Sequence, residues 1–224
     1  MKYIKKNPEP AAFAQWKQQS NADWKPNWDN FQKPEKPIVH DALLSEQGYI
    51  CCYCGQRINQ ITSHIEHFQP RTFYPNLKLE YKNFLASCPG YPEEDEPKPT
   101  QTKPSQEFCG QHKGAWYDEK LTVSPLQPDC ESYFRHTGTG EILSSSDKTK
   151  KEASDATIVH LNLNHRKLQA QRRSAIEGVL QDIETFTPDE LKSLIDSYDR
   201  LDSSGQYTPF CAVIIYTLKQ FIGS

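Results

Sequence analysis

The chain has 224 residues, with 26 Lys and Arg against 29 Asp and Glu, giving a formal net charge of −3. This balance lacks the basic character usual for nucleic-acid binding, so any phosphate contact must be local or shared with a partner. No apolar run approaches a membrane span and the first residues lack a signal peptide's apolar stretch, which favours a cytoplasmic protein with no membrane partner. The cysteines number seven, and an odd count fits metal binding better than a disulfide framework.

Residues 1–48 are expected to form an N-terminal helical segment. The run A-A-F-A-Q-W-K-Q-Q at 11–19 predicts a short helix. A second helix is expected to begin at Pro37 and to end at Gly48. Large aromatic residues between the two helices are expected to pack against the core: Trp24, Trp28 and Phe31.

Residues 49–146 hold the motifs that carry chemistry, followed by a hairpin. Strands are expected at 61–68 and 84–87, and a short helix at 109–117. The stretch 89–107 lacks periodicity, is rich in proline and contains an acidic cluster at 93–96, which predicts a loop. The run T-G-T-G-E-I at 137–142 is typical of the turn of a hairpin.

Residues 147–224 are expected to form a C-terminal helical region. A charged linker is expected at 147–151, with helix from residue 156 and Asn164 as a helix N-cap. Thr187 to Glu190 has the form of a capping box. Arg172 falls within an apolar helical stripe, so we expect its guanidinium to be buried and bonded to a carboxylate or to several backbone carbonyls. The stripe comprises Leu168, Ala175, Ile176, Val179, Leu180 and Ile183.

Four cysteines have the spacing of a structural zinc site. Cys51 and Cys54 form a C-x-x-C knuckle, and Cys88 and Cys109 complete a four-thiolate set. Buried free thiols or a redox pair are the alternatives, and Cys52 offers a second register for the knuckle. Cys130 and Cys211 are expected to be ordinary core cysteines.

A Glu-His pair and an Asn lie between these cysteines. His67 can act as the general base that takes a proton from water, and Glu66 can ligate a hard divalent ion such as Mg²⁺ or Mn²⁺. Asn83 can ligate that ion or hold the loop that aims His67, and His112 can supply a further ligand. Each residue alone is more often structural than functional, but the combination inside a four-cysteine frame favours a one-metal nuclease site.

The sequence indicates the roles of two further residues less strongly. Lys113 can contact nucleic-acid phosphate or be simply solvated. His64 is expected to be a surface or supporting residue on the opposite strand face to His67.

These motifs resemble HNH endonucleases, and more narrowly the PtuB-type HNH proteins of Septu and retron-associated anti-phage systems. The resemblance rests on Q-G-Y-I-C-C-Y-C-G, S-H-I-E-H-F-Q-P, Y-K-N-F-L-A-S-C and C-G-Q-H-K-G, and it continues in S-P-L-Q-P-D-C-E-S-Y-F and I-V-H-L-N-L-N-H-R-K-L. It covers roughly residues 10–220. Many HNH proteins have Asn or His directly after the last cysteine, where this chain has Gly110.

The resemblance implies an α+β protein with a zinc-braced ββα-metal core between N-terminal and C-terminal helical regions. It implies His67 as general base, Glu66 and Asn83 at the positions that bind the catalytic metal, and the four cysteines as zinc ligands. The implied function is cleavage of nucleic acid, DNA in preference to RNA, in anti-phage defence. The implied partners are a PtuA-type ATPase and, in retron settings, a reverse transcriptase complex. A non-catalytic zinc adaptor that docks on an ATPase or on nucleic acid is the alternative.

Overall fold

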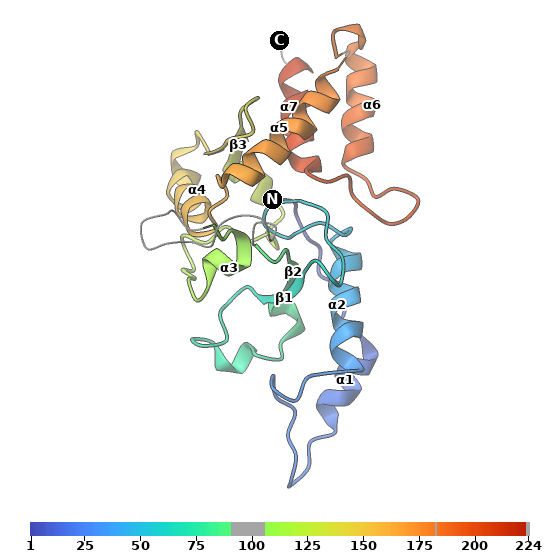
Figure 1. Cartoon of the computed structure of the whole chain (residues 1–224), viewed down its shortest axis with the longest axis vertical. Helices are drawn as coiled ribbons and strands as arrows, with labels where there is room; N and C mark the ends of the chain where they lie inside the picture. The colour runs from blue at the N-terminus through green and yellow to red at the C-terminus, as the bar shows by residue number, and fades with distance from the viewer. Residues whose placement is uncertain (91–105, 182, 223–224) are drawn as a thin grey trace.

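The structure is a computed structural model that describes residues 1–90, 106–181 and 183–222. The helices are α1 (Ala11–Gln18), α2 (Glu35–Glu46), α3 (Cys109–Lys113), α4 (Lys148–His160), α5 (Arg166–Leu180), α6 (Pro188–Tyr198) and α7 (Cys211–Ile222). The strands are β1 (His64–His67), β2 (Phe84–Ser87), β3 (Phe134–His136) and β4 (Ile142–Ser144). The molecule is elongated, with α1 at one end and α6 and α7 at the other (Figure 1). The acidic cluster expected at 93–96 lies outside the described residues.

Two small antiparallel sheets sit among the helices. One pairs β1 with β2 and the other pairs β3 with β4. In the first sheet Glu66 lies opposite Leu85 and His67 opposite Phe84. The mixture of helices with small antiparallel sheets agrees with the expected α+β class.

An aromatic cluster joins the N-terminal helices to the first sheet. The cluster includes Phe13 of α1, Phe84 of β2, and Phe31 from the segment between α1 and α2, and all three are fully buried. The ring centroids of Phe13 and Phe31 lie 4.8 Å apart. Trp24 and Trp28 are partly buried and pack against the same core. The expectation that these aromatics pack against the core is therefore confirmed. Burying such large rings removes apolar surface from water and anchors the N-terminal segment to the strand that precedes Cys88.

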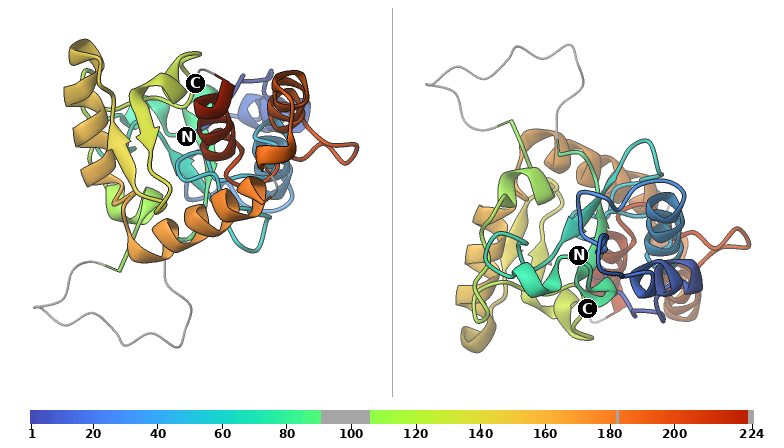
Figure 2. Two further views of the ribbon diagram at one scale, coloured as in Figure 1. Left: turned by 90° about the horizontal axis from the view of Figure 1, so that it is seen from above. Right: turned by 90° about the horizontal axis from the view of Figure 1, so that it is seen from below.

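The C-terminal helices have a smaller core of their own. Side chains of α5, α6 and α7 form it, including Val179, Leu191, Ile195, Ile214 and Leu218. The capping box at Thr187 and Glu190 is present at the start of α6, as the sequence predicts. Figure 2 shows α4 packed alongside the β3–β4 hairpin, at a distance from α6.

Arg172 joins α5 to the rest of the molecule. Its side chain is 2% exposed, and its Nε and Nη2 atoms donate to the carbonyl oxygens of Gly140 and Leu163 at 2.6 and 2.8 Å. The prediction of a buried guanidinium bonded to backbone carbonyls is confirmed. Burial lowers the pKa of Arg172 to about 10, so the group stays charged at neutral pH.

The structure corrects several local expectations. Residues 147–151 are not a linker, because the Asp147 side chain accepts a hydrogen bond from the Thr149 backbone N–H and caps α4. Asn164 is not the cap of α5. That role falls to His165, while Asn164 pairs with both backbone groups of Ile142. The first strand is shorter than the expected span of 61–68.

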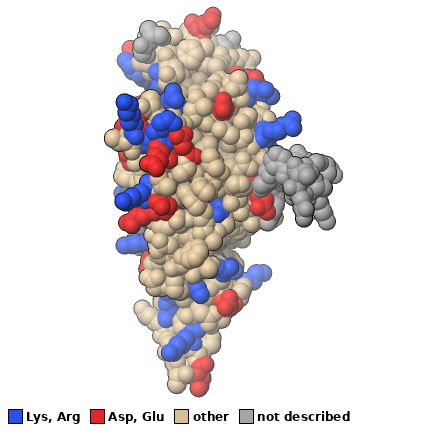
Figure 3. All heavy atoms as spheres, turned by 90° about the vertical axis from the view of Figure 1, so that its left-hand side faces the viewer, with Lys and Arg blue, Asp and Glu red and all other residues tan. Residues whose placement is uncertain are grey.

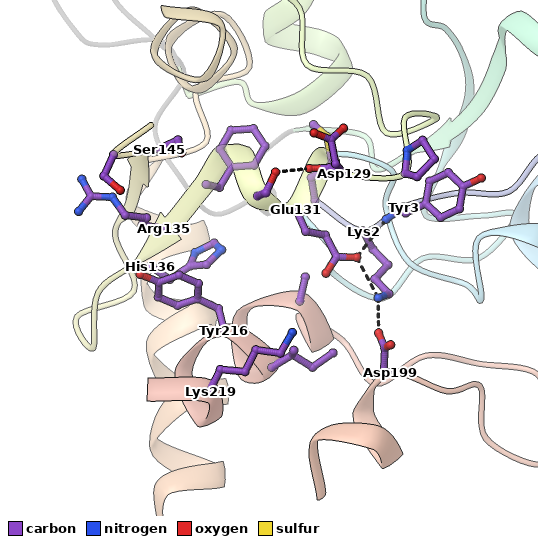
Figure 4. Close-up of a pocket in the computed structure, with 17 residues that line it drawn as sticks. Lys2, Tyr3, Asp129, Glu131, Arg135, His136, Ser145, Asp199, Tyr216 and Lys219 are labelled. Atoms are coloured by element: carbon purple, nitrogen blue, oxygen red, sulfur yellow. Dashed lines mark hydrogen bonds and ion pairs between the residues drawn. The ribbon is translucent and has the colours of Figure 1, made fainter. Parts of the chain in front are cut away.

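A cavity of about 720 Å³ lies where the N-terminal residues, the β3–β4 hairpin and α7 meet. Lys2 pairs with Glu131 and Asp199 on one wall, and His136 and Tyr216 line the other (Figure 4). No cysteine and no residue of β1 lines it. Across the described ranges, every helix is too short or too polar to cross a membrane.

Candidate functional site

A tight turn presents the first two cysteines. The Gly55 N–H donates to the Cys51 carbonyl at 3.1 Å, and the Cys51 N–H donates to Gln56 at 2.9 Å. Gly55 has a φ of +81°, in the left-handed region that glycine adopts without steric cost. The turn is fixed to the sheet because the Cys52 N–H donates to the Ala86 carbonyl at 3.2 Å.

The four sulfur atoms of Cys51, Cys54, Cys88 and Cys109 all lie within 4.8 Å of one another, and all four residues are buried. A tetrahedral zinc ion with Zn–S bonds of about 2.3 Å places its sulfurs roughly 3.8 Å apart. Cys54 and Cys88 are 4.0 Å apart, close to that value. The group could therefore hold a metal such as zinc, and the knuckle uses Cys51 with Cys54 and not the register that begins at Cys52.

Cys51 loses its proton more readily than an ordinary cysteine. Burial acts to raise the pKa of Cys51, but hydrogen bonds from the other thiols, Cys109 first, hold it well below the ordinary value. The Cys88 backbone N–H also points at Cys51 Sγ, 3.4 Å away. A thiolate, the form that binds metal, is thus already favoured at one of the four positions.

Glu66 is buried between α3 and the knuckle. Its Oε1 accepts hydrogen bonds from the Tyr53 hydroxyl at 3.1 Å and from Lys113 Nζ at 2.9 Å. Burial raises the pKa of Glu66, but the neighbouring His64 imidazole and the charge of Lys113 outweigh that effect and lower it below its usual range. The carboxylate is therefore charged at neutral pH, with Oε1 engaged by two donors and Oε2 facing elsewhere.

The second oxygen of Glu66 faces His64 and Gly110. His64 Nε2 lies 3.6 Å from Oε2. A Cβ at position 110 would come within 2.8 Å of Oε2 and 3.1 Å of His64 Nε2. The glycine thus leaves room for an imidazole beside the carboxylate, at the position where many HNH proteins carry Asn or His. The sequence signal for His64 is its period of two with Glu66 along β1, which puts both on one face.

His67, at the end of β1, is held from three sides. Its Nε2 lies 3.1 Å from the Lys78 carbonyl oxygen, which can only accept, so Nε2 carries the proton and Nδ1 holds the lone pair. Its ring packs edge-on against Trp28 at 4.4 Å and against Phe84 at 5.0 Å between centroids. Burial lowers the pKa of His67 and the nearby Arg71 charge lowers it further, although the bond to Lys78 opposes them.

Asn83 is engaged by the loop that follows β1. Its Oδ1 accepts from the Gln69 N–H at 2.8 Å, and its Nδ2 donates to the Gln69 and Leu77 carbonyls at 2.9 and 3.4 Å. Of the two roles open from the sequence, this geometry corresponds to holding the loop. Lys78, which orients His67, belongs to the same loop.

Two residues of α3 lie differently from their sequence-based roles. His112 Nδ1 is 3.0 Å from the His160 carbonyl, so its ring contacts α4. Lys113, expected to contact nucleic acid, is 3% exposed, and its Nζ binds Glu66 and the His67 carbonyl. A phosphate cannot reach this ammonium as it stands, because protein groups surround it.

These elements together form a recognisable unit. Two antiparallel strands and a short helix surround the Glu66–His67 pair, and the four-cysteine group joins the knuckle, β2 and α3. This arrangement is consistent with the ββα-metal core of HNH nucleases.

Comparison with known proteins finds relatives from retron and Septu systems. The chain is 34% identical over 150 residues to "Retron Vc95 putative HNH endonuclease" of Vibrio cholerae serotype O1 biovar El Tor, covering 65% of this chain and 66% of the relative. It is 38% identical over 55 residues to Septu protein PtuB of Bacillus thuringiensis, covering 24% of this chain and 21% of that protein. No family model matches the chain. The chain is similar to HNH proteins of the PtuB and retron-associated type, and this similarity supports a nuclease.

The matched segments are shorter than the relatives. They span just under two thirds of the first relative and about a fifth of the second, at 66% and 21%.

Proposed function

We propose that this protein is a metal-dependent endonuclease that hydrolyses phosphodiester bonds in nucleic acid, DNA in preference to RNA, as the effector of an anti-phage defence complex. The observation that carries the proposal is the state of His67. Its Nε2–H is fixed by the Lys78 carbonyl, its pKa is lowered, and it directly follows the ionised Glu66. General-base hydrolysis requires a neutral, oriented imidazole, and the Glu66 charge is near enough to act on the pKa of His67.

His67 accepts the proton of the attacking water at Nδ1, the nitrogen left free by the Lys78 contact. The water oxygen then attacks phosphorus in line with the departing sugar oxygen. Asn83 supports this step indirectly, because it fixes the loop that holds Lys78. Trp28 and Phe84 prevent the ring from rotating away.

Glu66 Oε2 and His64 Nε2 fit a divalent ion. Their separation is 3.6 Å, wider than the roughly 2.9 Å between adjacent ligands of an octahedral Mg²⁺ with bonds of about 2.0–2.1 Å, so the two side chains would close by about 0.7 Å on binding the ion. We assign these two atoms as protein ligands of Mg²⁺ or Mn²⁺, with His64 in the place expected for His112. When bound, such an ion stabilises the charge that develops on the phosphate.

Zinc in the four-cysteine group serves a structural role in this proposal. A small core with few strands gains folding energy from metal binding, because the preformed site exists only in the folded state. The buried thiols leave no open position at which a substrate could enter.

The proposed partner is a PtuA-type ATPase, with a retron reverse transcriptase complex as a further partner where a retron is present. The names of the two relatives, which refer to a retron and to Septu, support this assignment. The net charge of −3 is also that of an effector whose access to nucleic acid depends on a partner.

The test is incubation of the chain, alone and with its ATPase partner, with plasmid DNA and with RNA in Mg²⁺ or Mn²⁺. Cutting that requires the divalent ion and is lost in His67→Ala supports the proposal. Equal degradation by the two proteins, or intact nucleic acid in every condition while the partner complex still forms, identifies a non-catalytic adaptor.

A further inference from the structure

A second feature of the site concerns Trp28, which belongs to the segment between α1 and α2. Its ring lies 4.4 Å from the His67 ring and 5.7 Å from that of Phe84. Trp28 is only partly buried, so its ring forms a wall beside His67 that also reaches the surface.

Two cations from distant parts of the chain converge on this ring. Lys36 Nζ, from α2, lies 5.0 Å from the Trp28 ring centroid. Arg71 Cζ, from the loop after β1, lies 5.3 Å from the same centroid. The negative face of an indole attracts cations and holds both side chains in place.

Within the described parts of the chain, neither Lys36 nor Arg71 forms an ion pair with a carboxylate. Other lysines that touch aromatic rings are paired: Lys6 with Glu46, Lys17 with Glu9 and Lys150 with Asp129. With no carboxylate of the described residues paired to them, both charges at this ring are available to an external anion.

The distribution of charge on one face of the molecule also favours an anion. The lower part of the face in Figure 3, at the level of α1 and of residues 70–80 in Figure 1, carries Lys and Arg with few acidic groups. The upper part of the same face mixes both signs.

We propose that Lys36, Arg71 and Trp28 form the surface that grips the nucleic-acid backbone beside His67, with the two cations bound to phosphates that flank the one under attack. Because both cations contact one ring, their separation is at most the sum of the two ring distances. Phosphates of one strand follow each other about every 3.4 Å along the helix axis, so one strand can reach both. This assignment rests on the proposed nuclease function and replaces Lys113 as the source of phosphate contact.

The test measures binding of a fluorescein-labelled DNA duplex and of the matching single strand by anisotropy, over a series of KCl concentrations. All proteins carry His67→Gln so that no strand is cut. Arg71→Gln and Lys36→Gln are each expected to weaken binding and to reduce the slope of log affinity against log salt by about one, and the double variant by about two. The controls are Arg200→Gln and Lys192→Gln, which remove exposed cations at the other end of the molecule.

Unchanged slopes for Arg71→Gln and Lys36→Gln, or equal losses in the controls, would overturn the inference. A parent protein that binds neither form of DNA, alone or in complex with its ATPase partner, would also overturn it. Cleavage by the unmodified chain separates the two claims. Cutting with unchanged slopes refutes the phosphate surface alone, whereas reduced slopes without any cutting refute the nuclease function alone.

Discussion

The imidazole of His64 lies beside the carboxylate of Glu66, with Nε2 3.6 Å from Oε2. The residues are two apart on β1, and Gly110 of α3 leaves the space that they share. This relationship explains how the chain accommodates a glycine where many HNH proteins place a metal-binding side chain. In the proposed metal site the imidazole comes from the strand instead of the helix.

His64→Ala is therefore expected to weaken Mn²⁺ binding at least about tenfold, since even outer-shell partners of a metal typically contribute 10–100-fold. Titration followed by electron paramagnetic resonance measures this without reference to cutting. His112→Ala is the matched control, because that ring contacts the His160 carbonyl, and it should leave the affinity unchanged. Loss of Mn²⁺ binding in His112→Ala alone would restore the ligand set expected from the sequence.

Removing one sulfur from the buried group should remove both metal and stability. Cys54→Ser is expected to lose the single zinc ion found by metal analysis and to melt at a markedly lower temperature, because zinc binding contributes folding energy. Cys52→Ser should keep its zinc, since Cys52 lies outside the group of four. Full zinc content in Cys54→Ser would contradict the assignment.

Activity should fall on the acid side as His67 becomes protonated. The pKa of His67 is lowered from its ordinary value of 6.5 by burial and by Arg71. The cleavage rate should therefore be independent of pH near neutrality and should decline only below pH 6.5. Arg71→Gln removes a cation that disfavours the protonated ring, so its pKa should rise and the acid limb should move to higher pH. An unmoved limb, with Lys192→Gln as reference, would show that Arg71 does not act on His67.

Arg172→Met should destabilise the fold. The change leaves the Gly140 and Leu163 carbonyls without their donor, at a cost of about 1–3 kcal/mol for each buried group. Arg173 is largely exposed and only weakly paired with Glu177, so Arg173→Met should change stability by less than about 0.5 kcal/mol. Equal free energies of unfolding for the two variants, measured in urea, would refute the anchoring role of Arg172.

Local chemistry made much of this fold predictable. The cysteine register, the strand at Phe84–Ser87 and the capping box at Thr187 depend on residues close in sequence. Local composition can also mislead. The charged stretch that contains Asp147 predicts a linker, although Asp147 is the N-cap of α4.

Residues whose role depends on distant partners were harder to predict. Nothing in the sequence around Lys113 predicts that its ammonium forms a buried ion pair with Glu66. Trp28 has the spacing of a core aromatic, and only the folded chain brings it into contact with His67, Lys36 and Arg71. Long-range packing, which no local pattern encodes, decides these contacts.

The measurement that bears most directly on the account is the single-turnover cleavage rate of the partner-bound chain in Mn²⁺, compared with that of His67→Ala. A positioned general base contributes about 10²–10⁴-fold, so the variant should be slower by that factor while binding metal, partner and nucleic acid as before. A His67→Ala protein that cuts at the unmodified rate would contradict the assignment of His67, and with it the proposed mechanism.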